Sequence, residues 1–203
     1  MIYSPDICTW KDTSECEDCP INGELICHFH YKYLISFLGF FFIFAVTAFI
    51  GVILGGYGWY LLGWIGFWLF FFEVWEIRIL CSHCPYYAEE GRILHCIANY
   101  SSLKLWKYHP EPMNLSEKFQ LIIGFIILMG YPLIFLILGY QFIILIISII
   151  EIIVFFSFLI IRRCGSCPNF SCPFNRVKKE VVDLFLNKNP VMKEAWENAG
   201  YKI

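Results

Sequence analysis

The stretch Arg78-Ile-Leu-Cys81-Ser-His-Cys84-Pro85 opens a polar, cysteine-rich segment that lies between two long apolar hairpins. Its Cys-x-x-Cys-Pro motif is repeated, and the chain carries it at Cys16/Cys19, Cys81/Cys84 and Cys164/Cys167. Each copy flanks an apolar stretch of membrane length. The chain is therefore organised as cysteine-rich polar segments that alternate with apolar segments.

The composition favours a membrane protein over a soluble domain. Of the 203 residues, 59% are apolar and 20% are aromatic, which is too apolar for a surface that faces water on all sides. Residues 1–6 contain neither a basic region nor an apolar run, so we expect no cleavable signal peptide. The first membrane helix is then expected to direct insertion.

Four apolar runs are long enough, at about 1.5 Å per residue, to cross a hydrocarbon core of about 30 Å. The predicted transmembrane helices are residues 33–54, 57–80, 119–140 and 141–161. Glycines between the first two runs predict a tight turn, and almost no loop separates the last two. The sequence therefore predicts an all-α integral membrane protein with four transmembrane helices arranged as two hairpins.

Three polar segments remain outside these helices: an N-terminal arm (1–32), a central loop (81–118) and a tail (162–203). Val177, Val181, Leu184 and Phe185 follow a helical spacing, so the tail is expected to contain a short amphipathic helix. A second short helix is predicted to begin at Asn189-Pro190 and to end near Gly200.

The distribution of positive charge predicts the orientation in the membrane. All fifteen Lys and Arg residues lie in the arm, in the tail or between Arg78 and Lys118, and none lies in the two tight turns. Positive charge marks the cytoplasmic side. We therefore expect a cell-membrane protein with cytoplasmic N- and C-termini and with every cysteine and histidine on the cytoplasmic side. Without a histidine in the membrane helices, the usual axial ligand of a haem between helices is missing.

Ten cysteines in a reducing compartment indicate metal binding rather than disulfides. A Cys-x-x-Cys pair supplies two thiolates to one ion, and later residues complete a tetrahedron. The arm supplies four cysteines, and the central loop and the tail supply three each, so the count fits three four-ligand sites. His95 is the histidine expected to join the central loop, and His28 or His30 is the candidate that could complete the tail. The predicted metal ligands are Cys8, Cys16, Cys19, Cys27, Cys81, Cys84, Cys96, Cys164, Cys167, Cys172 and His95.

Zinc and iron–sulfur clusters both accept these ligand types. Proline follows Cys19, Cys84, Cys167 and Cys172, and Cys-Pro also ends the ligand run of bacterial ferredoxins, but their compact Cys-x-x-Cys-x-x-Cys core is missing. The sequence therefore favours zinc, with an iron–sulfur cluster as the alternative.

Glu151 is the polar residue that stands out inside the membrane segments. It lies about ten residues into the fourth predicted helix, near the bilayer midplane, where a carboxylate is costly and often functional. One interpretation is a proton or cation site in a small transporter. The other is a protonated glutamic acid that holds two helices together.

These patterns lead to three functional hypotheses. The first is a multi-pass membrane protein with a zinc-bound cytoplasmic platform that docks a cytoplasmic protein or shapes a membrane site. The second is an electron-transfer or thiol-redox protein that uses iron–sulfur clusters or reactive cysteine pairs, most plausibly Cys164/Cys167 beside Arg162-Arg163. The third is the transporter with Glu151. The lipid bilayer is the expected partner in all three, and no nucleic acid is expected.

Overall fold

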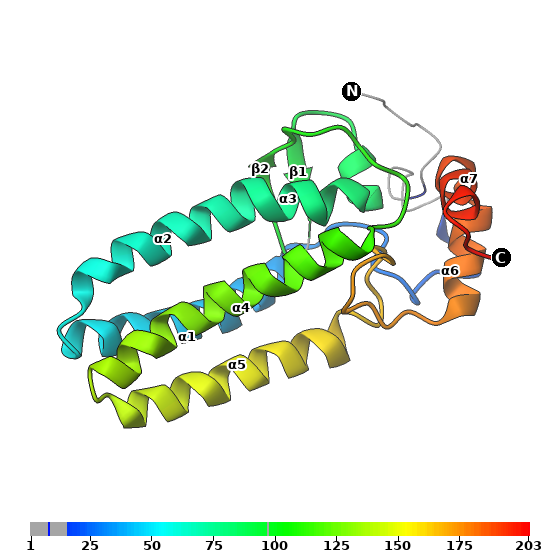
Figure 1. The fold of residues 1–203 in the computed structure, drawn as a ribbon. Coiled ribbons are helices and arrows are strands. Elements are labelled where there is room, and N and C mark those ends of the chain that lie inside the picture. The colour runs from blue at the N-terminus through cyan, green and yellow to red at the C-terminus, as the bar shows by residue number, and fades with distance from the viewer. Residues whose placement is uncertain (1–7, 9–15, 97) are drawn as a thin grey trace.

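The computed structural model describes residues 8, 16–96 and 98–203 (Figure 1). Much of the predicted arm, namely residues 1–7 and 9–15, lies outside the described residues, as does residue 97. Among the described residues, three helices are long and apolar enough to cross a membrane: α1 (Tyr31–Leu54), α4 (Leu115–Leu138) and α5 (Phe142–Arg162). The protein is mostly helical, in agreement with the predicted all-α membrane protein.

The region of the second predicted helix, residues 57–80, is helical but divided. It consists of a 3₁₀ turn η3 (Gly58–Tyr60), α2 (Leu61–Phe70), the π-helical segment η4 (Phe71–Trp75) and α3 (Glu76–Ile79). Figure 1 shows α2 and α3 following one another along α4. Because the π-helical segment interrupts the α-helix, neither α2 nor α3 has the length of a membrane span by itself.

A proline in α4 explains how α2 packs against it. Pro132 lies inside α4 and has no backbone N–H, so the carbonyl of Leu128, four residues earlier, lacks its usual helical donor. Trp64 of α2 supplies the replacement, because its indole Nε1–H donates to the Leu128 carbonyl at 2.8 Å. Trp64 is fully buried, so this bond satisfies a carbonyl that water does not reach.

Small residues bring the two tight turns together at one end of the helices. Gly51 and Gly55 form a Gly-x-x-x-Gly pair at the end of α1, and Gly139 follows α4. A Cβ atom at Gly139 would lie only 2.6 Å from the Cα of Gly55, and one at Gly51 would lie 2.4 Å from a methyl group of Leu136. Glycine is therefore what permits this close approach of the backbones.

The remaining elements lie at the opposite end of the helices (Figure 1). They include a two-stranded antiparallel sheet of β1 (Ile93–His95) and β2 (Tyr100–Leu103), which the sequence analysis did not anticipate. The tail forms α6 (Lys179–Asn187) and α7 (Pro190–Asn198), and α7 begins at the predicted proline. Buried side chains of α6 and α7 pack with the central loop in a second hydrophobic core, separate from the core between the long helices.

Candidate functional site: a pocket lined by six cysteines

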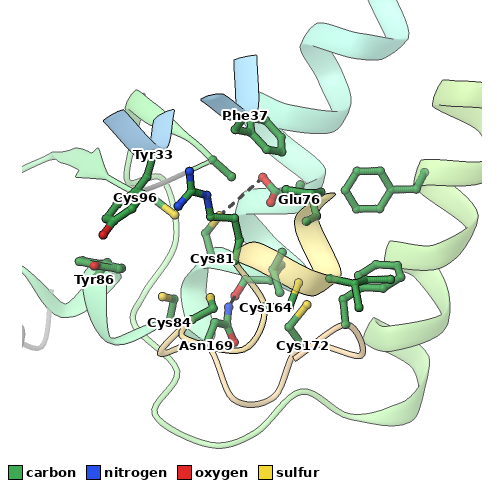
Figure 2. Close-up of a pocket in the computed structure, with 18 of the residues that line it drawn as sticks. Tyr33, Phe37, Glu76, Cys81, Cys84, Tyr86, Cys96, Cys164, Asn169 and Cys172 are labelled. Carbon is green, nitrogen blue, oxygen red and sulfur yellow. Dashed lines mark hydrogen bonds between the residues drawn. The ribbon is translucent and has the colours of Figure 1, made fainter. Parts of the chain in front are cut away.

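The central loop and the tail meet around a cavity of about 120 Å³. Six thiols line it, and Figure 2 shows five of them, Cys81, Cys84, Cys96, Cys164 and Cys172, together with Phe37 and Glu76. Cys167 is the sixth. Apolar side chains from α1, η4, α4 and α5 form the other walls, so the cavity lies where the long helices end: Phe37, Phe72, Phe125, Phe156, Leu159 and Ile160.

The Cys-x-x-Cys pair of the central loop, Cys81/Cys84, follows directly after the second helical region. Cys81 begins a 3₁₀ turn, η5 (Cys81–His83), in which the backbone N–H of Cys84 donates to the carbonyl of Cys81 at 2.9 Å. A second 3₁₀ turn, η6 (Pro85–Ala88), follows, and its Tyr86 also lines the cavity. This tight geometry places both thiols of the pair at the cavity, and both are buried.

Asn99 positions the third cysteine of the central loop. The backbone N–H of Cys96 donates to the carbonyl of Asn99 at 3.0 Å. The side-chain amide of Asn99 donates to the carbonyl of Phe72 at 2.9 Å and to Glu76 Oε2 at 3.1 Å. Because Phe72 lies in the π-helical segment, where the hydrogen-bond register shifts, its carbonyl is available to a side chain. The sheet that carries Cys96 is thereby fixed to the second helical region.

Asn169 performs the same role for the tail. Its amide donates to the carbonyl of Leu80 at 3.0 Å, which attaches the tail loop to the residue before Cys81. Asn175 closes that loop, since its amide donates to the carbonyls of Cys167 and Asn169 at 2.8 and 3.0 Å. The tail cysteines are consequently held against the central loop by side-chain hydrogen bonds to the backbone.

Burial makes these thiols weak acids when no metal is bound. Burial raises the pKa of Cys84 well above its ordinary value, and the neighbouring Cys96, Cys167 and Cys172 raise it further. Burial likewise raises the pKa of Cys167, with Cys172 and Cys96 adding to the effect. For Cys172 burial raises the pKa to about 12. These thiols therefore lie in one poorly solvated space, close enough for the charge on one to raise the pKa of another.

This electrostatic situation disfavours the thiol-redox hypothesis at Cys164/Cys167. A reactive thiol needs a lowered pKa, because the thiolate is the nucleophile. Burial instead raises the pKa of Cys164, and it outweighs the opposing effect of the Arg176 guanidinium. The basic context of Arg162-Arg163 therefore does not produce an activated thiolate here.

The thiols surround a cavity rather than a point. Within the part of the chain that the structure describes, no three Cys, His, Asp or Glu side chains are arranged as the ligands of one metal ion. Zinc–sulfur bonds are about 2.3 Å long, so binding would draw the side chains inward. Metal binding by these residues stays a prediction.

The arm cysteines form a second group. The Sγ of Cys16 lies 3.7 Å from Nε2 of His28, and a cavity of about 420 Å³ is lined by both of these residues and by Cys19 and Cys27. Burial raises the pKa of Cys27 to about 12, with Cys8, Cys16 and Cys19 contributing. The structure thus gathers the ten predicted cysteine ligands into two groups, four in the arm and six in the pocket.

His95 does not reach either group in this structure. Its Nδ1 lies 3.3 Å from Oε2 of Glu89, and its ring packs against Tyr100 with the centroids 5.2 Å apart. Its side chain is 38% exposed, and it does not line the six-cysteine pocket. The sequence indicated His95 because it adjoins Cys96. In the structure His95 is the last residue of β1, Cys96 follows it, and of the two only Cys96 lines the pocket.

Glu151 connects two of the long helices. The hydroxyl of Thr47 in α1 donates to Oε1 of Glu151 in α5 at 2.9 Å. Such a bond is expected of a glutamic acid that holds two helices together. The other oxygen, Oε2, is buried without a hydrogen-bond partner among the described residues, so the proton or cation site also stays a prediction.

Three asparagines that sequence reasoning did not select are structurally important. Asn99 and Asn169 hold the pocket segments, as described above, and Asn114 caps α4 by accepting from the backbone N–H of Glu117 at 2.9 Å. This cap starts α4 at Leu115, ahead of the predicted span 119–140. Asn114 had a sequence signal, because Asn114 and Glu117 are spaced as a capping box ahead of an apolar run. The bonds of Asn99 and Asn169 to distant backbone carbonyls left no local pattern.

Comparison with known proteins gives no relative from which a role could be transferred. No protein-family model matches the chain. No curated protein and no solved structure matches it either.

Proposed function

We propose that this is a four-span membrane protein whose cytoplasmic segments form a platform around a thiolate-ligated metal centre in the six-cysteine pocket. The observation that supports the proposal best is the convergence of Cys81, Cys84 and Cys96 with Cys164, Cys167 and Cys172 on one cavity. More than sixty residues and two long helices separate the two sets. A ligand bound by thiols of both segments would stabilise this arrangement of residues that are so distant in sequence.

A fourth span, formed by η3, α2, η4 and α3 together, is part of this proposal. The consecutive helical segments from Gly58 to Ile79 together exceed the roughly 20 residues that a span requires, and the chain continues through the π-helical segment without a loop. It also lies along α4 (Figure 1). Four spans put the arm, the pocket and the tail on the same side, which the one-sided distribution of Lys and Arg marks as cytoplasmic.

A metal would resolve the electrostatic cost of the pocket. Six thiols lie there with little solvent, and a bound cation stabilises the thiolate form that burial otherwise disfavours. The ligands come from two segments, so binding free energy would become folding free energy of the platform, as in structural zinc sites. Thiolate ligands suit zinc in such a structural role and suit an iron–sulfur cluster equally in type.

The test is metal analysis of the purified protein in detergent, with one cysteine replaced in each segment. Cys84→Ser and Cys167→Ser should each lower the bound metal and speed proteolysis of the central loop between Ala98 and Lys107. Ser166→Ala is the matched control, because Ser166 lies between two pocket cysteines and is not a predicted ligand. Equal metal content in the control and in the Cys84→Ser/Cys167→Ser double variant would refute the metal-centred platform.

A further inference from the structure

The dimensions of the pocket point to a ligand larger than one ion. A water molecule needs roughly 10–15 Å³ of such volume, so a cavity of about 120 Å³ has room for a group of several atoms. Four thiolates around a single zinc ion, at about 2.3 Å each, close the site completely. Six thiols are also two more than one tetrahedral ion requires.

Arg163 provides a second, independent observation. It lines the same cavity, directly after α5, and its Nη2 donates to the hydroxyl of Ser36 at 2.7 Å. Its guanidinium lies over the ring of Tyr33, 4.5 Å from the centroid. Its Nε is buried and has no hydrogen-bond partner among the described residues. None of the ion pairs found between described residues includes Arg163.

A partly buried guanidinium without a carboxylate is costly unless an anion compensates it. Thiolate-ligated metal centres carry net negative charge, and their properties depend on neighbouring charges and hydrogen-bond donors. Arg163 is therefore placed as the cationic neighbour of an anionic group in this cavity. A zinc tetrathiolate would satisfy that charge as well, so the volume and the number of thiols distinguish the two.

The thiols of the two segments lie close to one another at the cavity. Cys96 and Cys167 both raise the pKa of Cys84, and Cys96 also raises the pKa of Cys167. Cys81 has a hydrogen-bond partner, because its thiol donates to Oε2 of Glu76 at 3.6 Å.

We propose that the pocket takes a polynuclear iron–sulfur cluster, ligated by cysteines of both segments, Cys84 and Cys167 among them, with Arg163 as the positively charged residue beside it. This inference rests on the proposed metal centre and specifies its chemistry. It assigns Cys81, whose thiol donates to Glu76, to the surroundings of the cluster rather than to its ligands. Arg163 is expected to set the reduction potential of the cluster. Its positive charge stabilises the reduced, more negative state and thereby raises that potential.

The experiment is anaerobic purification of the full chain, followed by analysis of iron, zinc and acid-labile sulfide with visible and electron paramagnetic resonance spectra. The Ser166→Ala protein should contain iron and sulfide in equal amounts. Each of Cys84→Ser and Cys167→Ser should lose one cluster's worth of both, whereas Cys81→Ser should keep it. Counting the loss relative to the control removes any contribution from metal in the arm.

Arg163 is tested by redox titration of the cluster signal. Arg163→Gln should lower the midpoint potential, and Arg163→Lys, which keeps the charge, should stay closer to the unmodified protein. Equal potentials in all three proteins would overturn the role of Arg163. Stoichiometric zinc without sulfide, lost on cysteine replacement, would overturn the cluster and leave the metal-centred platform standing. Absence of any cysteine-dependent metal would overturn both proposals.

Discussion

The bond between Trp64 and Leu128 allows a quantitative test of how α2 and α4 are held together. Trp64→Phe removes the indole donor and leaves the Leu128 carbonyl without a partner, because Pro132 offers no N–H. An unsatisfied buried carbonyl costs about 1–3 kcal/mol, and hydrogen bonds between membrane helices average less, so we expect about 1–2 kcal/mol from this term. The smaller phenylalanine adds a packing loss at a fully buried position.

A double-mutant cycle isolates the hydrogen-bond term. Pro132→Ala restores a backbone N–H that can donate to the Leu128 carbonyl, so in that background Trp64→Phe should cost only the packing loss. The free energies of unfolding of the four proteins, measured in mixed detergent micelles, should therefore give a coupling energy of about 1–2 kcal/mol. Strictly additive effects would refute the argument that tryptophan replaces the donor missing at proline.

Two further predictions concern orientation and pH. Trp59→Cys, in the exposed turn before α2, should react with a membrane-impermeant thiol reagent on intact cells, whereas Lys202→Cys in the tail should react only after permeabilisation; the reverse pattern would invert the proposed topology. In metal-free protein, burial raises the pKa of Cys172 to about 12, whereas an unfolded thiol ionises near pH 8.5. The unfolded state then loses protons first, so thermal stability should fall as the pH rises above about 8.5, and a flat profile up to pH 10 would contradict this burial.

The long helices were predictable because lipid imposes length and composition directly on the sequence. Residues 33–54, for example, contain no charge, and α1 covers this range. The second helical region was harder to predict in detail, since a π-helical segment depends on local packing and on a side chain such as Asn99 that arrives from elsewhere. Hydropathy predicts a helix there, but it does not show where the backbone hydrogen bonds change from the α-helical to the π-helical pattern.

The cysteine grouping was only partly predictable. Spacing identified the Cys-x-x-Cys pairs, and the arm does keep its four cysteines together. Spacing assigned a separate site to the central loop and another to the tail, with His95 or an arm histidine as the fourth ligand. The structure instead joins these two segments at one cavity, because Asn169 bonds to Leu80. A contact across 89 positions leaves no periodic signal in a single sequence.

The position of the last three pocket cysteines has a consequence for how the protein is made. Cys164, Cys167 and Cys172 follow α5, so the cavity exists only once the long helices and the chain as far as Cys172 have been synthesised. Chains grow from the N-terminus, and local elements form before distant ones meet. Truncation before Cys164 would thus leave the first three thiols without an enclosure, and a ligand of the pocket, as proposed above, would bind late in biogenesis rather than during early folding.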